Sequence, residues 1–315
     1  MAKPNPPSAN SHLPILIAGP TAVGKSEIAL RLAERLGGEI ISADSMQVYR
    51  GLDLGTAKSS SADRARIPHH LIDICDLAES FDAAQFVRLA QKAVEEIQAH
   101  GRVPVFCGGT GLYFKAFLSG LGEAPAANPE LRARLEAMPF EALLQELRER
   151  DPAAYEKIDK QNPRRVIRAV EVIRLTGKKF SQHRAEWKSA VHSPRPELFC
   201  LTRATEDLRR RIDMRVDAMF ARGLVDETRA LLQRGLTDNQ TAMQAIGYRQ
   251  VVEHLRGERS LEETIELVKI RTRQFAKRQL TWFRRHGQWR WWELKPGETA
   301  AETMGKISLE AGAKS

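Results

Sequence analysis

The sequence is poor in the features that mark disulfide-rich, metal-clip or membrane proteins. Three cysteines among 315 residues are too few and too widely spaced for a disulfide framework or a Cys-x-x-Cys metal site, so we expect buried free thiols at Cys75, Cys107 and Cys200. No run of about 18 apolar residues occurs, and no membrane span is predicted. The first twelve residues lack the apolar centre of a secretory signal. These absences predict a cytoplasmic protein without membrane contact.

Charge is only moderately unbalanced. The chain has 49 Lys and Arg residues against 40 Asp and Glu residues, which gives a formal net charge of +9. A basic balance favours polyanionic partners, but it does not identify a nucleic-acid-binding protein, because the position of the charge matters more than its sum.

The first hundred or so residues alternate between apolar strands and amphipathic helices. Alternation of this kind predicts a parallel sheet with helices on both faces. We expect strands at residues 13–19, 39–43, 71–75 and 102–107, and helices at residues 25–36 and 82–100.

The pattern changes after residue 120. Residues 120–129 are rich in Gly, Ala and Pro, as linkers are, and residues 131–176 indicate helices interrupted by three prolines. A second hinge at residues 193–196 leads back to a strand at 197–201, and a mostly helical stretch then precedes a last strand at 289–294.

These features predict an α/β fold with two parts. A parallel sheet core like that of the P-loop NTPases would comprise residues 1–121 and 196–315, with a helical C-terminal region. Residues 122–195 would form a helical insert domain.

A phosphate-loop motif follows the first predicted strand and opens the first predicted helix. Backbone N–H groups of such a loop surround an anion, the lysine reaches a terminal phosphate and the last hydroxyl ligates Mg²⁺. The motif G-x-x-x-x-G-K-[ST] is matched by Gly19, Pro20, Thr21, Ala22, Val23, Gly24, Lys25 and Ser26.

The motif predicts binding of a diphosphate or triphosphate group but does not name the compound. ATP and GTP are its usual occupants, and an NTPase usually places an acidic residue after a later strand to help hold Mg²⁺. The strand at 102–107 is followed instead by Gly108-Gly109-Thr110-Gly111, without an acid. A small-molecule kinase therefore stays the alternative function, on weaker grounds.

Asp44 directly follows the second predicted strand. Ligands bind at the carboxyl ends of strands in open α/β sheets, so we expect this carboxylate beside the phosphate loop. Three roles are open from position alone: a Mg²⁺ ligand, a general base or a helix cap.

The motifs together resemble those of a known family. Five further blocks accompany the phosphate loop: residues 44–58 (DSMQVYRGLDLGTAK), 68–73 (PHHLID), 108–113 (GGTGLY), 244–248 (QAIGY) and 276–284 (AKRQLTWFR). In this order they resemble the tRNA dimethylallyltransferases, also called isopentenyl-diphosphate:tRNA transferases. The resemblance covers roughly residues 13–285.

The resemblance implies a prenyltransferase. Such an enzyme moves a dimethylallyl group from dimethylallyl diphosphate to the exocyclic amine of the adenosine 3′ of the anticodon. The phosphate loop would then hold a diphosphate leaving group, with Mg²⁺ at Ser26 as the cofactor. Catalytic roles would fall to Asp44 as base, to Thr110 and to Lys25, and Arg211 would contact the diphosphate.

Two of these assignments have plainer alternatives. Thr110 could simply cap the helix that begins near Gly111, and residues 209–211 could be a solvated charged face whose register is undefined. The adjacent His69 and His70 point to different sides of an extended chain, so we expect structural roles for them.

The tRNA anticodon loop is the predicted macromolecular partner of a monomeric enzyme. Basic residues interleaved with tryptophans occur between residues 269 and 292 and suit backbone binding and base stacking, although core packing by most of the tryptophans is also expected. The expected tRNA contacts are Asp44, Ser45, Met46, Gln47, Arg164, Arg165, Arg168, Gln244, Gly247, Tyr248, Lys277, Arg278, Gln279, Thr281, Trp282 and Arg284.

Overall fold

The computed structural model describes residues 13–120, 125, 127–183 and 196–312. The chain divides into two compact units. One unit comprises Met1–Phe117 and Val191–Ser315, and the other comprises Leu118–Ala190. The boundaries expected from the sequence were residues 122 and 195. The second expected hinge, at residues 193–196, lies outside the described residues except for Pro196.

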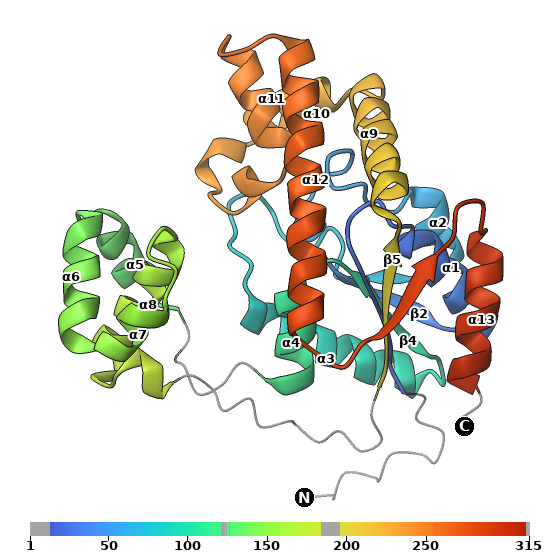
Figure 1. The fold of residues 1–315 in the computed structure, drawn as a ribbon, viewed down its shortest axis with the longest axis horizontal. Helices are drawn as coiled ribbons and strands as arrows, with labels where there is room; N and C mark the ends of the chain where they lie inside the picture. The colour runs from blue at the N-terminus through green and yellow to red at the C-terminus, as the bar shows by residue number, and fades with distance from the viewer. Residues whose placement is uncertain (1–12, 121–124, 126, 184–195, 313–315) are drawn as a thin grey trace, which may run out of the picture. The chain divides into compact units, whose positions relative to one another are not determined.

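The larger unit is built on a six-stranded parallel sheet (Figure 1). Its strand order is β3-β2-β4-β1-β5-β6, so the expected parallel α/β fold is confirmed. The central strands are apolar and buried because helices cover both faces. The strands are β1 (Ile15–Ala18), β2 (Glu39–Ala43), β3 (His69–His70), β4 (Pro104–Gly108), β5 (Glu197–Arg203) and β6 (Arg290–Leu294).

Helices on the two faces complete the core of this unit. Helix α1 packs on β4 and on α13, whereas Phe106 of β4 turns to the other face and meets Phe117 of α4, with ring centroids 4.5 Å apart. Asp82 begins α3 with a capping box, as expected. The helices are α1 (Lys25–Leu36), α2 (Ser61–Arg66), α3 (Ala83–Ala99), α4 (Gly111–Ser119) and α13 (Ala300–Gly312).

Two expectations about this core were wrong. The strand expected at residues 71–75 is replaced by the short β3, because Leu71 and Asp73 take φ angles of 63° and 56° that break an extended run. The three cysteines are free, but only Cys75 and Cys200 are buried. Cys107, the residue before the last of β4, is partly exposed where it lines the cavity beside the phosphate loop.

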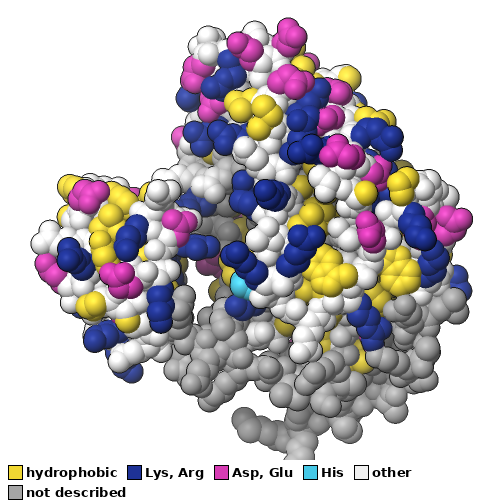
Figure 2. Space-filling model, in the orientation of Figure 1, with side chains coloured by type: hydrophobic (Ala, Val, Ile, Leu, Met, Phe, Trp, Pro, Cys, Tyr) yellow, Lys and Arg dark blue, Asp and Glu magenta, His cyan; other side chains and the backbone are white. Residues whose placement is uncertain are grey.

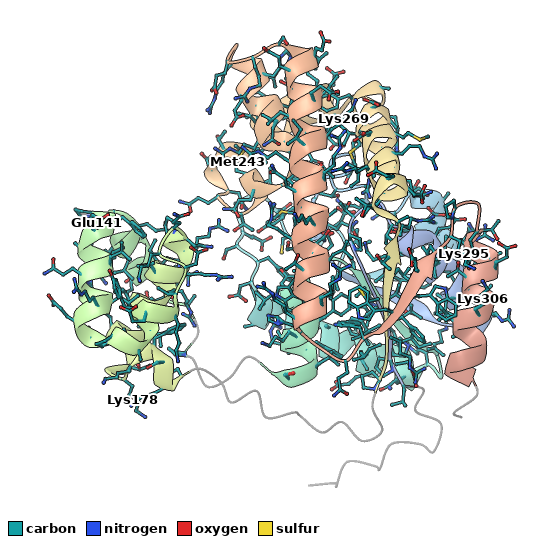
Figure 3. All side chains as sticks on the ribbon, in the orientation of Figure 1. Glu141, Lys178, Met243, Lys269, Lys295 and Lys306 are labelled. Carbon is teal, nitrogen blue, oxygen red and sulfur yellow. The ribbon has the colours of Figure 1, made fainter. Side chains whose placement is uncertain are left out.

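The C-terminal helical region packs on the same unit. Helix α12 lies along α9, where Arg273 pairs with Asp213 at 2.5 Å and Lys269 pairs with Asp217 at 2.8 Å (Figures 1 and 3). The elements are α9 (Thr205–Ala221), α10 (Leu224–Leu232), η2 (Leu236–Asp238), η3 (Ala242–Gln244), α11 (Tyr248–Leu255) and α12 (Leu261–Arg285).

The smaller unit is a helical bundle with its own core. Pro152 and Pro163 each start a helix, where a missing N–H costs nothing, and Pro139 caps another. The elements of the smaller unit are α5 (Pro129–Glu136), α6 (Phe140–Arg150), α7 (Pro152–Lys157), α8 (Pro163–Thr176) and η1 (Phe180–Gln182).

None of the helices described in either unit is long and apolar enough to cross a membrane.

Candidate active site

The phosphate loop joins β1 to α1. Gly19, Ala22 and Gly24 have positive φ angles of 147°, 63° and 109°, so the loop turns tightly around the N-terminus of α1. Lys25 Nζ donates to the Pro20 carbonyl at 2.7 Å and closes the loop. Burial lowers the pKa of Lys25 to about 8. Lys25 is thus still charged at neutral pH but poorly hydrated, a state that favours binding of an anion.

Three arginines surround the loop. Arg211 Nε donates to the Ala22 carbonyl at 3.0 Å, and Arg203 Nε donates to the Val23 carbonyl at 2.8 Å. An Arg215 guanidinium nitrogen donates to Thr21 Oγ1 at 3.1 Å. Arg211 and Arg215 add positive charge beside the anion-binding loop, whereas Arg203 pairs with the buried Asp207 at 3.0 Å.

Of these three arginines, only Arg211 was expected from the sequence. Arg215 lies one helical turn after Arg211, so helical periodicity could have found it. Arg203 ends β5, and no local pattern distinguishes it. The neighbouring Arg209 and Arg210 pair with acids of their own helix, at 3.4 and 2.8 Å, so the register of the charge run is now defined.

Asp44 lies at the carboxyl end of β2, facing the phosphate loop. One of its oxygens, Oδ1, accepts hydrogen bonds from the backbone N–H groups of Met46 and Gln47, at 2.9 and 3.4 Å. This carboxylate therefore caps a turn, and no helix begins there. Within the described residues its second oxygen accepts no hydrogen bond, and Asp44 lines a cavity with Lys25 and Ser26.

Thr110 directly precedes α4, but its side chain does not cap this helix, which was the alternative to a catalytic role. Its carbonyl accepts from the Tyr113 and Phe114 N–H groups and so starts α4. Its hydroxyl oxygen accepts instead from the backbone N–H of Ser45, at 3.1 Å. Thr110 therefore holds the residue that follows Asp44.

Gln279 of α12 bonds to the phosphate loop and to the loop between β4 and α4. The Gln279 side chain accepts from the Thr21 N–H and donates to the Gly109 carbonyl, both at 2.9 Å. A Cβ at Gly109 would lie 2.2 Å from Gln279, and one at Gly111 would lie 2.1 Å from the Trp282 ring, so this close approach requires glycine at both positions.

The cavity is mainly polar. Asp44 is the one carboxylate among its described lining residues, and Lys25 and Arg215 are the cations. Cys107 also lines it, and burial raises the pKa of this thiol to about 11, so it is neutral at pH 7. One carboxylate beside several anion-binding groups is an arrangement suited to proton removal next to a phosphate site.

A basic surface lies over α12. Figure 2 shows Lys and Arg side chains gathered along this helix. Lys277, Arg278 and Arg284 are exposed, whereas Thr281 and Trp282 are half-buried. Acids of α9 pair with Lys269 and Arg273, so the basic surface is shorter than the sequence suggested.

Several expected tRNA contacts lie inside the protein. Tyr248 is 0% exposed, and Gly247 is also buried. Gln279 is buried and bonded to two loops. Packing and internal hydrogen bonds occupy these three residues, and Gln279 also lines the cavity with Asp44, so their contact with RNA stays a prediction. The exposed Gln244 precedes them in the chain.

The remaining expected contacts divide between the two units. Ser45, Met46 and Gln47 are half-buried in the turn after β2. In the smaller unit Arg164 and Arg165 are exposed in the first turn of α8, but Arg168 forms a 2.6 Å ion pair with the buried Glu171. This ion pair gives Arg168 a structural role, and its contact with RNA stays a prediction. A guanidinium committed to a buried carboxylate is costly to withdraw.

Comparison with known proteins decides the family. The model of the IPP transferase family matches residues 47–286. The chain belongs to the IPP transferase family. The match begins after the phosphate loop and Asp44, whereas α12 lies wholly within it.

Relatives in this family cover nearly the whole chain. The tRNA dimethylallyltransferase 1 of Trichlorobacter lovleyi is 48% identical over 282 residues, which are 88% of this chain and 92% of the relative. The tRNA dimethylallyltransferase of Halorhodospira halophila is 49% identical over 278 residues, 86% and 90% of the two chains.

Solved structures agree with these relatives. The tRNA isopentenylpyrophosphate transferase of Bacillus halodurans has a TM-score of 0.69 and 40% identity, with 96% of this chain and 98% of that chain covered. A eukaryotic dimethylallyltransferase acting on tRNA has a TM-score of 0.78 and 28% identity, with 94% and 78% covered.

Proposed function

We propose that this chain transfers a dimethylallyl group from dimethylallyl diphosphate to the exocyclic amine of the adenosine 3′ of the anticodon in tRNA. The observation that carries this proposal is a cavity that residues of the phosphate loop and Asp44 line together. Relatives that match most of the chain are named tRNA dimethylallyltransferases, which supports the proposal.

The reaction exchanges a carbon–oxygen bond for a carbon–nitrogen bond. The bond from the allylic carbon to the diphosphate breaks, and its electron pair leaves with the diphosphate. The adenine nitrogen supplies the pair for the new bond and loses one proton. Asp44 takes this proton, because its Oδ1 is fixed by two backbone N–H groups while its other oxygen is open to the cavity.

The phosphate loop binds the leaving group. Negative charge grows on the diphosphate as the allylic bond breaks, and Lys25, Arg211 and Arg215 surround the loop that receives it. Charges that are already in place need no reorganisation during the reaction, so they stabilise the transition state more than water would.

The residues also fit a magnesium ion held mainly by the substrate. Among the described residues no cluster of three or more His, Cys, Asp or Glu side chains could cage a metal. The Ser26 hydroxyl lines the cavity and would be one ligand, with diphosphate oxygens and water as the others, as Mg²⁺ prefers. When bound, the ion would neutralise part of the charge on the diphosphate.

The basic surface of α12 suits the RNA. Exposed Lys277, Arg278 and Arg284 would contact phosphates of the anticodon loop, and Arg165 of the smaller unit would add a further contact. The target adenine must leave the stacked loop to reach Asp44, as bases do in enzymes that modify them.

A transfer assay tests the proposal. The protein is incubated with labelled dimethylallyl diphosphate, Mg²⁺ and unmodified tRNA, and in parallel with labelled ATP. We expect label in tRNA and one diphosphate released per prenyl group. Phosphate transfer from ATP without label in tRNA would contradict the proposal and favour a small-molecule kinase.

A further inference from the structure

We propose that Lys58, Glu227 and Tyr248 are positioning residues, which fix the turn at residues 53–58 and through it the Asp44 carboxylate. The inference rests on the proposed role of Asp44 as the base. It also assigns Tyr248 to the active site of the protein, in place of the RNA contact expected from its sequence block.

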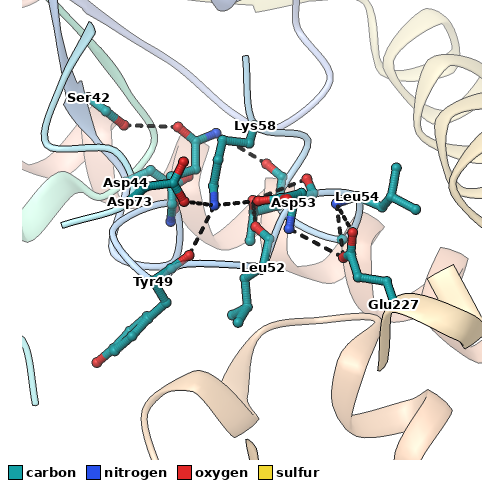
Figure 4. Close-up of polar contacts among 12 residues, drawn as sticks. Ser42, Asp44, Tyr49, Leu52, Asp53, Leu54, Lys58, Asp73 and Glu227 are labelled. Carbon is teal, nitrogen blue, oxygen red and sulfur yellow. Dashed lines mark hydrogen bonds and ion pairs between the residues drawn. The ribbon is translucent and has the colours of Figure 1, made fainter. Parts of the chain in front are cut away.

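Lys58 fixes the turn from inside. Its ammonium donates to the Tyr49 carbonyl at 3.0 Å and to carboxylate oxygens of Asp53 and Asp73, both at 2.6 Å (Figure 4). Three acceptors satisfy all three N–H groups of a side chain that is 2% exposed. Asp73 also accepts from Arg64 at 2.6 Å, which anchors the cluster to α2.

Glu227 of α10 holds the same turn from outside. Both of its carboxylate oxygens lie 3.0 Å from the Leu54 N–H, and Oε1 also accepts from the Asp53 N–H at 3.3 Å (Figure 4). Glu227 thus binds the backbone of Asp53 and Leu54, whereas Lys58 binds the Asp53 side chain, so two opposite charges hold the turn through different groups.

Tyr248 bonds both to Glu227 and to the turn itself. Its hydroxyl donates to Glu227 Oε1 at 2.6 Å and accepts from the Gly55 N–H at 3.1 Å. A Cβ at Gly55 would lie 2.5 Å from the Tyr248 ring, so the turn packs directly on the ring face. The side chain is wholly buried and already makes both hydrogen bonds that its hydroxyl offers here.

Gln47 connects the turn to the base. Its side-chain amide donates to the Thr56 carbonyl at 3.2 Å and accepts from the Ser42 hydroxyl at 2.9 Å. Its backbone N–H donates to Asp44 Oδ1 at 3.4 Å. Thr56 also lines the cavity beside Asp44. A shift of the turn would therefore move both the base and the cavity wall.

Two conservative substitutions test the inference in the full-length protein. Tyr248→Phe keeps the ring and removes both hydrogen bonds, and Glu227→Gln keeps the shape and removes the charge. Asp226→Asn is the matched control, because Asp226 is exposed on the same helix and pairs only with Arg229 in the described structure. The measurements are the single-turnover rate at saturating substrates, the tRNA Kd, thermal unfolding, and hydrogen exchange of residues 53–58.

We expect the single-turnover rate to fall roughly 10- to 100-fold in both variants, because small displacements of a catalytic group have effects of that size. The tRNA Kd should stay unchanged, exchange at residues 53–55 should accelerate, and Asp226→Asn should match the wild type. The double variant should be no slower than the worse single one, because the two side chains act as a unit.

A raised tRNA Kd with an unchanged rate would overturn the inference and make Tyr248 an RNA ligand. An unchanged rate together with unchanged exchange would also overturn it. A wild-type protein that transfers nothing to tRNA would contradict the proposed function instead. Hydrogen exchange alone would then test whether Glu227 and Tyr248 fix the turn.

Discussion

The phosphate loop and the segment from Asp44 to Lys58 form two walls of one cavity, but they hold their shapes in different ways. The backbone turn of the loop is closed within its own motif, by the Lys25 bond to Pro20 and by positive φ angles, although side chains from α9 and α12 also bond to it. The second segment depends on distant residues, Glu227 and Tyr248 among them. The backbone shape of the phosphate loop is therefore encoded largely within its motif, whereas the turn beside the proposed base is placed by tertiary contacts.

The largest expected effect concerns the local side of this comparison. Lys25→Met removes a charge aimed at the leaving diphosphate, and we expect kcat/KM to fall by about 10³. Lys92→Met on the exposed face of α3 is the control and should have no effect. A loss of less than tenfold would show that the loop does not stabilise the leaving group.

The same comparison explains what the sequence could predict. The motif from Gly19 to Ser26 is sufficient to predict a phosphate loop. The flanking β1 and α1 were both expected at nearly the observed bounds. Asp44 was found because it follows a strand of a parallel sheet. These predictions needed only local spacing and the direction of the sheet.

The rest needed contacts that no local pattern specifies. Tyr248 lies 193 residues from its partner Gly55, and Gln279 lies 258 residues from Thr21. A block rich in polar and aromatic residues is compatible with RNA contact and with internal bonding alike. Which of the two holds depends on burial, and only the fold decides that.

The next prediction compares the stability of two variants, Lys58→Met in the second segment and Lys25→Met in the phosphate loop. Lys58→Met removes the buried cation shared by Asp53 and Asp73, but Asp53 is exposed and Asp73 keeps Arg64, so we expect the free energy of unfolding to fall by about 1–3 kcal/mol. Lys25→Met should leave stability unchanged or higher, because burial already lowers the pKa of Lys25 and opposes its charge. Urea denaturation measures both, and equal losses would break the comparison.

The pH dependence tests the phosphate loop next. The pKa of Lys25 is about 8 in the folded protein, and diphosphate binding prefers the charged form, so donor affinity should be constant below pH 8 and fall above it. Well above this pKa the loss should approach tenfold per pH unit, since one proton is linked to binding. Donor KM measured from pH 6 to 9.5 checks this, and a flat profile would contradict it.

The smallest expected effects lie on the surface of α12. Lys277→Gln and Arg278→Gln should each raise the tRNA Kd a few-fold and reduce the slope of log Kd against log salt by about one. Lys295→Gln, which removes an exposed charge outside α12, should leave both quantities unchanged. Equal slopes in all three variants would mean that α12 does not contact the RNA phosphates.

The most direct test of the whole account is the Asp44→Asn variant. Asparagine keeps an oxygen for the Met46 and Gln47 N–H groups but cannot take a proton. We predict a single-turnover rate lower by about 10²–10⁴, with donor and tRNA Kd values close to those of the wild type. An unchanged rate, or an equal loss of tRNA binding, would contradict the assignment of Asp44 as the base.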